Sequence, residues 1–259
     1  MNDAVSAPLL AAGWLLGMLL MMEVGYRAGR RRMRSDPERG MTGLGAIEGA
    51  VFALFGLLIA FTFSGAASRF DSRRQLIAEE ANAIGTAYLR LDLLPESSQP
   101  ALRVSFRDYV DSRVAVFRKL PDLEAAGAEL ARSQELQSGI WTLSVAATRD
   151  PGAHVDAAKL LLPALNEMID ITTTRTMATR IHPPPTIFYL LFILGLGCSL
   201  LAGYGMAEAT SRSWLHILGF TLVMAVSLYV ILDIEYPRAG LIRLDPYDQV
   251  LVELRDTMR

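Results

Sequence analysis

The chain has 259 residues, of which 52% are hydrophobic, and its formal net charge at pH 7 is -2. The mean hydropathy is positive, at +0.30, and the apolar residues gather in four long runs, which excludes an ordinary soluble globular domain. The slightly acidic balance leaves no basic face for nucleic acid. We therefore expect an integral membrane protein, with its single cysteine, Cys198, unable to form an intrachain disulfide.

The first predicted span covers about Ala7 to Tyr26. It has no basic residue before it and no small-residue cleavage site behind it, so we expect a retained span rather than a signal peptide. Glu23 lies near its end, where a carboxylate is either functional or close enough to the surface to pair with arginine. Pairing is favoured because six arginines follow at once: Arg27, Arg30, Arg31, Arg32, Arg34 and Arg39.

These arginines also predict an orientation. A short loop that is rich in arginine normally stays in the cytoplasm, which places Arg27 to Gly43 inside the cell. The amino terminus, the region from Arg69 to His182 and the carboxyl tail would then lie outside. Contact between the arginines and anionic lipid headgroups is compatible with this placement.

The stretch from Gly45 to Leu94 is predicted to be one helix that begins in the membrane and continues into water. No charge falls between Glu48 and Arg69, which is long enough to cross a hydrocarbon core of ~30 Å. The helical register continues past Arg69, and no proline interrupts it before Pro95. Glu48 begins the span at the same level as Glu23, and we expect an arginine partner for it too.

The membrane half of this helix carries two strips. Small residues allow close approach between helices, and they fill one strip: Gly45, Gly49, Ala53, Gly56, Ala60, Ser64 and Ala67. Beside it, residues spaced by four form an apolar strip of Phe55, Ile59 and Phe63. Two interpretations remain open: the span packs against its neighbours in the chain, or it repeats around an oligomer axis and lines a path.

Beyond the membrane, large apolar residues spaced by seven form one side of the helix, which we call the seam. Large apolar residues suit packing driven by the hydrophobic effect in water. The seam residues are Phe70, Ile77, Ile84 and Leu91. Glu79 and Glu80 fall off the seam, and with Arg73 and Arg74 they are expected to form ordinary pairs on a solvated helix.

The region 69–182 is predicted to be a helical bundle without strands, because its apolar residues keep a 3.6-residue period and its turns carry proline. The polar run Thr172 to Thr176 either solvates a helix or faces water in a vestibule. Two further spans follow, Thr186 to Ala207 and Trp214 to Leu232. Asp245 and Pro246 begin a tail helix, whose apolar side is expected to dock on the bundle or on a neighbouring subunit.

Several motifs in the chain resemble those of the bacterial bestrophin-like membrane proteins, distant relatives of the bestrophin anion channels. The motifs are Gly56 to Ser64, Arg69 to Arg74, Glu79 to Arg90, Leu93 to Pro95, Arg180 to Tyr189 and Asp233 to Gly240. The resemblance implies a pentamer whose second span lines the pore, with apolar residues four apart at its neck. Phe55, Ile59 and Phe63 match that spacing. It also implies that the region between spans two and three is cytoplasmic, opposite to the arginine rule, which we favour because it is read from these residues.

Residues that would carry out catalysis do not cluster in the sequence. His154, His182 and His216 lie in different segments with no partner at ligand spacing, so no metal site is predicted. No glycine-rich phosphate loop is present either. We expect no enzyme activity and no cofactor.

The predicted fold is all-α: a four-span helical membrane protein with an extramembrane helical bundle. Its parts are residues 1–68 with spans one and two, 69–182 with the bundle, 183–233 with spans three and four, and 234–259 with an amphipathic tail. The favoured function is a homo-oligomeric, bestrophin-like channel for small inorganic ions, anions by resemblance, in the bacterial inner (plasma) membrane. The alternative is a non-conducting envelope sensor or scaffold protein that binds partners through its bundle.

Overall fold

The computed structural model describes residues 3–35, 44–120, 122–209, 212–238 and 240–258, and within them every regular element is a helix. The chain forms two compact units. The first, which we call the membrane unit, comprises Met1–Ser68 and His182–Leu241. The second, the bundle unit, comprises Arg69–Ile181 and Ile242–Arg259.

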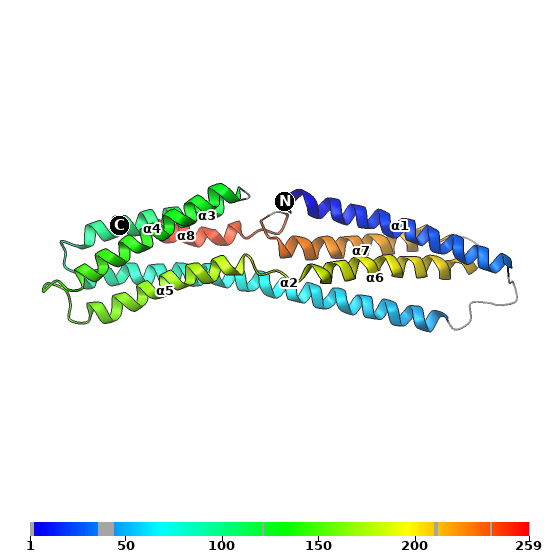
Figure 1. The fold of residues 1–259 in the computed structure, drawn as a ribbon, viewed down its shortest axis with the longest axis horizontal. Coiled ribbons are helices and arrows are strands. Elements are labelled where there is room, and N and C mark those ends of the chain that lie inside the picture. Colours follow the sequence, from blue (N-terminus) through cyan, green and yellow to red (C-terminus); the bar gives the residue numbers. More distant parts are fainter. Residues whose placement is uncertain (1–2, 36–43, 121, 210–211, 239, 259) are drawn as a thin grey trace. The chain divides into compact units, whose positions relative to one another are not determined.

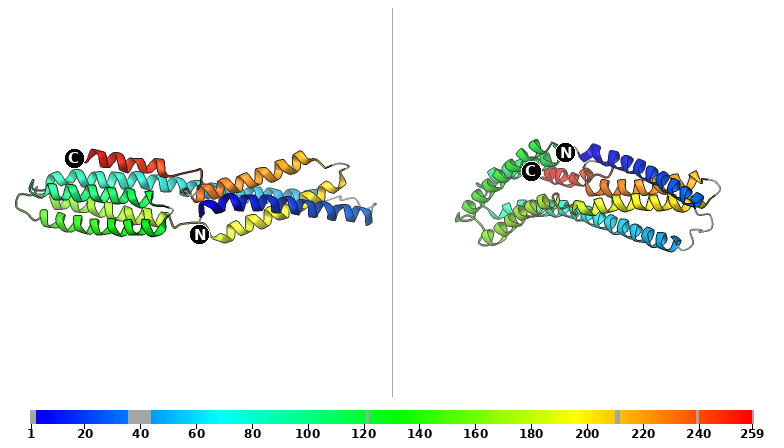
Figure 2. Two further views of the ribbon diagram at one scale, coloured as in Figure 1. Left: turned by 90° about the horizontal axis from the view of Figure 1, so that it is seen from above. Right: turned by 45° about the vertical axis from the view of Figure 1, so that its right-hand side comes forward.

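The membrane unit contains four long helices that lie side by side (Figures 1 and 2). They are α1 (Asp3–Ser35), the first part of α2 (Leu44–Leu89), α6 (Pro185–Gly205) and α7 (Trp214–Glu235), with a short 3-10 turn, η2 (Met206–Glu208), after α6. Each α-helix is long and apolar enough to cross a membrane. The predicted all-α, four-span fold is confirmed.

Helix α2 is uninterrupted over 46 residues, and it therefore belongs to both units. It passes Ser68 without a break, as predicted, because neither proline nor a change of helical register falls there. It ends earlier than predicted, since the 3-10 turn η1 (Arg90–Leu93) comes before Pro95. One helix thus has its first half in an apolar unit and its second half in a charged one.

Helices α1 and α6 make the closest contact in the membrane unit, and glycine permits it. A Cβ atom on Gly25 would lie 2.0 Å from the Leu200 carbonyl oxygen, and one on Gly203 would lie 2.0 Å from the Met22 carbonyl oxygen. Gly195 instead makes room for a side chain, the ring of Trp14. The backbone-to-backbone packing at Gly25 and Gly203 is typical of membrane helices.

Helix α2 contacts the other spans differently, through large side chains. Phe55 meets Trp14 edge to face, with ring centroids 6.3 Å apart, and Phe52 meets Phe220 at 6.1 Å. Its own glycines Gly45, Gly49 and Gly56 contact nothing: a Cβ atom at any of them would have no neighbour within 4 Å. These three glycines are therefore not used for packing inside this chain.

The bundle unit is built from the second part of α2, η1, α3 (Gln99–Arg118), α4 (Leu123–Ala147), α5 (Ala157–Ala178) and α8 (Asp245–Thr257). Its core buries three residues of the predicted seam, Ile77, Ile84 and Leu91, all at most 2% exposed. The fourth, Phe70, is half-buried and meets Tyr247 of α8 edge to face. Leu251 of α8 is fully buried, so the tail helix docks on the bundle of its own chain.

Residues 234–241 lie with the membrane unit rather than with the tail. The buried Asp233 carboxylate accepts a hydrogen bond from the Leu241 backbone N–H at 3.0 Å. A Cβ atom on Gly240 would lie 1.4 Å from Asp233 Oδ1, so a larger residue there would displace the Asp233 carboxylate. The hydrogen bond holds Leu241 at the end of α7, and the membrane unit accordingly extends to Leu241.

Candidate functional site

The stripe of small residues on α2 is exposed over most of its length. The exposed members are Gly45, Gly49, Ala53, Gly56, Ala60 and Ser64, and the last member, Ala67, is half-buried. The span does pack against neighbouring helices of the same chain, through Phe52 and Phe55, but it does so beside the stripe and leaves the stripe exposed. Small residues give no advantage against lipid tails, but they allow two helices to approach closely. The exposed stripe is therefore suited to contact with another copy of the chain.

The three residues of the predicted apolar strip have different environments. Phe55 is only 1% exposed, Ile59 is half-buried, and Phe63 is 43% exposed. A spacing of four residues turns about 40° beyond a full helical turn, so the strip winds from the packed face to the free one. This corrects the prediction for Phe55: its ring packs against Trp14 and cannot also line a pore. For Ile59 and Phe63 pore lining stays a prediction.

The two acidic residues near one end of the spans also differ. Glu23 forms ion pairs with Arg27 at 2.6 Å and with Arg212 at 2.8 Å, so its predicted pairing with arginine is confirmed. Arg212 precedes α7 and was not foreseen. Glu48 has no ion pair with any residue that the structure describes, contrary to expectation, and Arg39 lies outside the described residues.

The bundle unit contains a network of buried charges at its centre. Glu80 is fully buried and accepts hydrogen bonds from Arg113 Nε, at 2.5 Å, and from Arg175 Nη1. Arg175 Nη2 also donates to Asp248 of α8, so two carboxylates meet two guanidinium groups from four helices. The expectation that Glu80 forms a surface pair is wrong: the helix turns Glu79 to solvent and Glu80 inward.

A layer of neutral polar groups adjoins these charges. The hydroxyls of Tyr109 and Thr172 lie 2.9 Å apart, and Gln137 Nε2 donates to both at 3.0 Å. The ring of Phe117 lies beneath the Arg175 guanidinium, 3.7 Å from ring centroid to Cζ. The polar run that begins at Thr172 therefore divides: its first residue is buried in the network, and Thr173 and Thr174 are exposed.

The charge network changes the proton affinity of its members. Burial alone would raise the pKa of Glu80, but the two guanidinium groups outweigh it and hold this pKa below the ordinary value. Burial, helped by the negative charge of Glu80, raises the pKa of Tyr109 to about 12 from 10.0. Both groups therefore stay in their native charge states, carboxylate and neutral phenol, across the physiological range.

The raised pKa of Tyr109 predicts that the free energy of unfolding decreases at alkaline pH. Its folded pKa exceeds its unfolded one, so its contribution is fully present below pH 10 and is lost as the pH rises toward about 12. We expect the free energy of unfolding to fall on the order of 2 kcal/mol more over that window in the wild type than in Tyr109→Phe. Urea unfolding of the detergent-solubilised protein at pH 8 to 12 measures it, and parallel profiles would contradict the prediction.

The sequence contained a signal for this network. Arg113 falls on the apolar side of its helix, four residues after Tyr109 and four before Phe117, and Arg175 follows Met168 and Thr172 on the apolar side of α5. Glu80 likewise falls between Ile77 and Ile84. A charge that interrupts an apolar stripe on several helices of one bundle indicates buried partners.

Metal coordination has no candidate in the part of the chain that the structure describes, where no three His, Cys, Asp or Glu side chains gather. His182 instead lies with its Nδ1 2.8 Å from Glu235, and its ring stacks on Tyr236. These contacts position the segment before α6 against the end of α7.

Comparison with known proteins agrees with this architecture. A sequence profile of the Bestrophin-like domain matches residues 14–248. A crystal structure of a bacterial bestrophin homologue from Klebsiella pneumoniae superimposes with a TM-score of 0.69 at 14% identity, covering 95% of this chain and 96% of that one. A substituted form of the Klebsiella homologue gives 0.67 at 15% identity, covering 96% and 98%. No curated protein matches.

The profile covers both units, from the first span to the tail helix, and the solved structures share the whole fold. The chain therefore belongs to the bestrophin-like family of membrane proteins.

Proposed function

We propose that this protein is a homo-oligomeric channel of the bacterial inner membrane that conducts small anions along an axis surrounded by α2 helices. The family supports the proposal, since its distant bestrophin relatives are pentameric anion channels. The assignments of anion, pentamer and inner membrane all rest on that relationship. The Klebsiella structures, at 14–15% identity, support the fold alone.

The main support for the proposal is that so little of the membrane part of α2 is buried within the chain. Only 6% of its most apolar stretch is buried within the chain, compared with 44% for α7. A helix with this much free surface and a continuous stripe of small residues gains most by meeting copies of itself. In a ring of copies, the edge of that free face points toward the axis.

Phe63 lies at the border of the free face and is the side chain best placed to narrow such a path. It is 43% exposed, and Ile59, one turn before it, is half-buried. No charge falls between Glu48 and Arg69, so water and ions meet an apolar constriction there. An apolar neck of this kind gates by dewetting.

We expect Phe63→Ala to raise anion flux by about tenfold or more, because a wider and less apolar neck holds water more readily. The purified protein is placed in liposomes, and efflux of chloride or iodide is followed. Phe61→Ala is the matched control: it removes the same side chain two residues away, at a position that is 65% exposed on the other side of α2.

Equal effects of Phe61→Ala and Phe63→Ala would contradict pore lining by Phe63. Liposomes in which wild type and Phe63→Ala both fail to conduct would contradict the channel itself. A cross-linking ladder that ends at five would support the pentamer.

A scaffold or sensor is the second candidate. It is supported by the lack of any charged residue deep in the spans to attract an ion, since Glu23 and Glu48 both lie near one end. Liposomes that show no anion efflux, together with a protein that stays bound to this chain during purification from membranes, would favour this candidate.

A further inference from the structure

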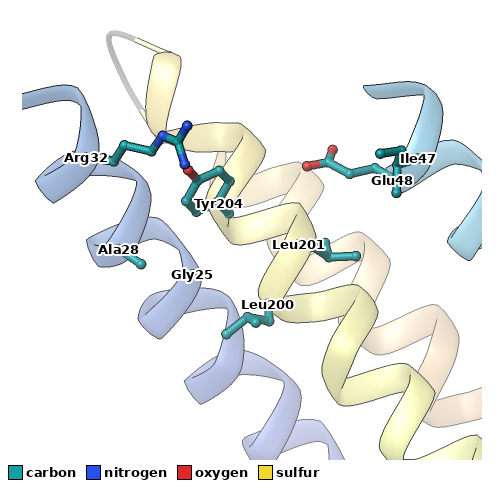
Figure 3. A pocket seen from close by; sticks show the side chains of 8 residues that line it. All are labelled: Gly25, Ala28, Arg32, Ile47, Glu48, Leu200, Leu201 and Tyr204. Carbon is teal, nitrogen blue, oxygen red and sulfur yellow. The ribbon is translucent and has the colours of Figure 1, made fainter. Parts of the chain in front are cut away.

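The membrane unit contains a cavity of about 300 Å³ between α1, α2 and α6, at the end of the spans where the arginines follow (Figure 3). Its walls are mainly aliphatic, with Ile47 on α2 and Leu200 and Leu201 on α6. Two charged side chains project at its rim, Arg32 from α1 and Glu48 from α2. The lining of the cavity is therefore almost entirely apolar, and one positive and one negative group lie at its rim.

Glu48 lies where a cation would be stabilised. Its carboxylate rests against the end of α6, and a Cβ atom on Gly205 would lie 3.1 Å from Glu48 Oε2. The carboxyl end of a helix carries partial negative charge, which is unfavourable for a carboxylate. Among the described residues no arginine, lysine or histidine forms an ion pair with Glu48 to offset it. An ammonium group in the cavity would supply that missing charge.

Arg32 offers the complementary group on the opposite wall. It is exposed and forms no ion pair with a described residue, and Figure 3 shows its guanidinium beside Tyr204. A guanidinium matches the geometry of phosphate oxygens and binds them with two parallel hydrogen bonds. It also follows directly after an apolar span, at the depth where lipid headgroups lie.

We propose that this cavity binds a phospholipid with a phosphoethanolamine headgroup. The phosphate pairs with Arg32, the ammonium donates to Glu48, and the start of an acyl chain lies along Ile47, Leu200 and Leu201. A choline headgroup has no N–H to donate to Glu48, and a glycerol headgroup carries no positive charge. The two fixed charges thus select one zwitterionic headgroup over the other common ones.

The test measures retained lipid on the purified full-length protein by native mass spectrometry. Dioleoyl phosphatidylethanolamine, phosphatidylcholine and phosphatidylglycerol are added separately at equal concentration. We expect ethanolamine lipid to bind at least about tenfold more tightly than choline lipid, which is the ratio that one charge-assisted hydrogen bond supplies. Glu48→Gln should remove that preference, and Arg32→Gln should weaken binding of ethanolamine and choline lipids alike.

Glu79→Gln is the matched control, because Glu79 lies exposed on the same helix outside the cavity, and it should bind lipid like the wild type. Equal retention of the three lipids, or a preference that survives in Glu48→Gln, would overturn the proposal. The measurement needs no ion flux, so its outcome is separate from that of the channel experiment.

Discussion

Glu80→Gln should destabilise the protein by about 3 to 5 kcal/mol, the usual cost of leaving buried charges without their partner. The substitution keeps the size of the side chain and removes the negative charge that Arg113 and Arg175 share. Both guanidinium groups are nearly inaccessible to water, at 0% and 4% exposure. Because whole domains are stable by only about 5 to 15 kcal/mol, urea unfolding of the solubilised protein should show a large drop in midpoint.

Glu79→Gln is the control for that experiment, since the exposed neighbouring carboxylate should change stability by no more than about 0.5 kcal/mol. The double variant Glu80→Leu with Arg113→Met should recover much of the loss, because apolar groups of similar volume can replace a buried ion pair. Arg175 keeps Asp248 as its partner in that variant. If Glu80→Gln unfolds at the wild-type midpoint, the network does not stabilise the bundle unit.

Gly49→Leu and Gly56→Leu should each dissociate the proposed oligomer and leave the fold of the single chain intact. A Cβ atom at either position would have no neighbour within 4 Å, so a leucine finds room within the chain. In an assembly that brings the small stripes together, the same leucine would hold the backbones apart. Chemical cross-linking and light scattering in detergent measure the subunit number, and circular dichroism measures the retained helix.

Gly203→Leu provides the contrast. A side chain there would strike the Met22 carbonyl, with its Cβ atom at 2.0 Å, so this variant should lose stability in the single chain. Gly49→Leu and Gly56→Leu variants that keep the wild-type subunit number would show that the stripe faces lipid, and the proposed assembly through α2 would fail.

Much of the fold was predictable because each helix carries its own local pattern. Four apolar runs predicted four spans, and the unbroken register through Ser68 predicted that α2 continues beyond the membrane. The spacing of Ile77, Ile84 and Leu91 predicted the side of α2 that the bundle buries. These features depend on periodicity and composition, which a sequence displays directly.

Details that depend on which neighbour covers a residue were not predictable in this way. Phe55 and Phe63 belong to one strip in the sequence, but Trp14 from another helix covers only Phe55. Glu79 and Glu80 are adjacent and identical, and only the second meets guanidinium groups that come from residues 33 and 95 positions away. Glu48 likewise lies beside an apolar cavity and forms no ion pair with a described residue, although an arginine partner was expected for it.

The sequence alone determined the helices, the four spans, the continuous α2 and its small-residue stripe, because hydrophobic periodicity and side-chain size act locally along a helix. Only the tertiary structure decided which face of α2 remains free, which glutamate is buried and where a cavity opens between the spans. Those outcomes follow from contacts between segments far apart in the chain, where burial and charge pairing depend on every helix that packs nearby.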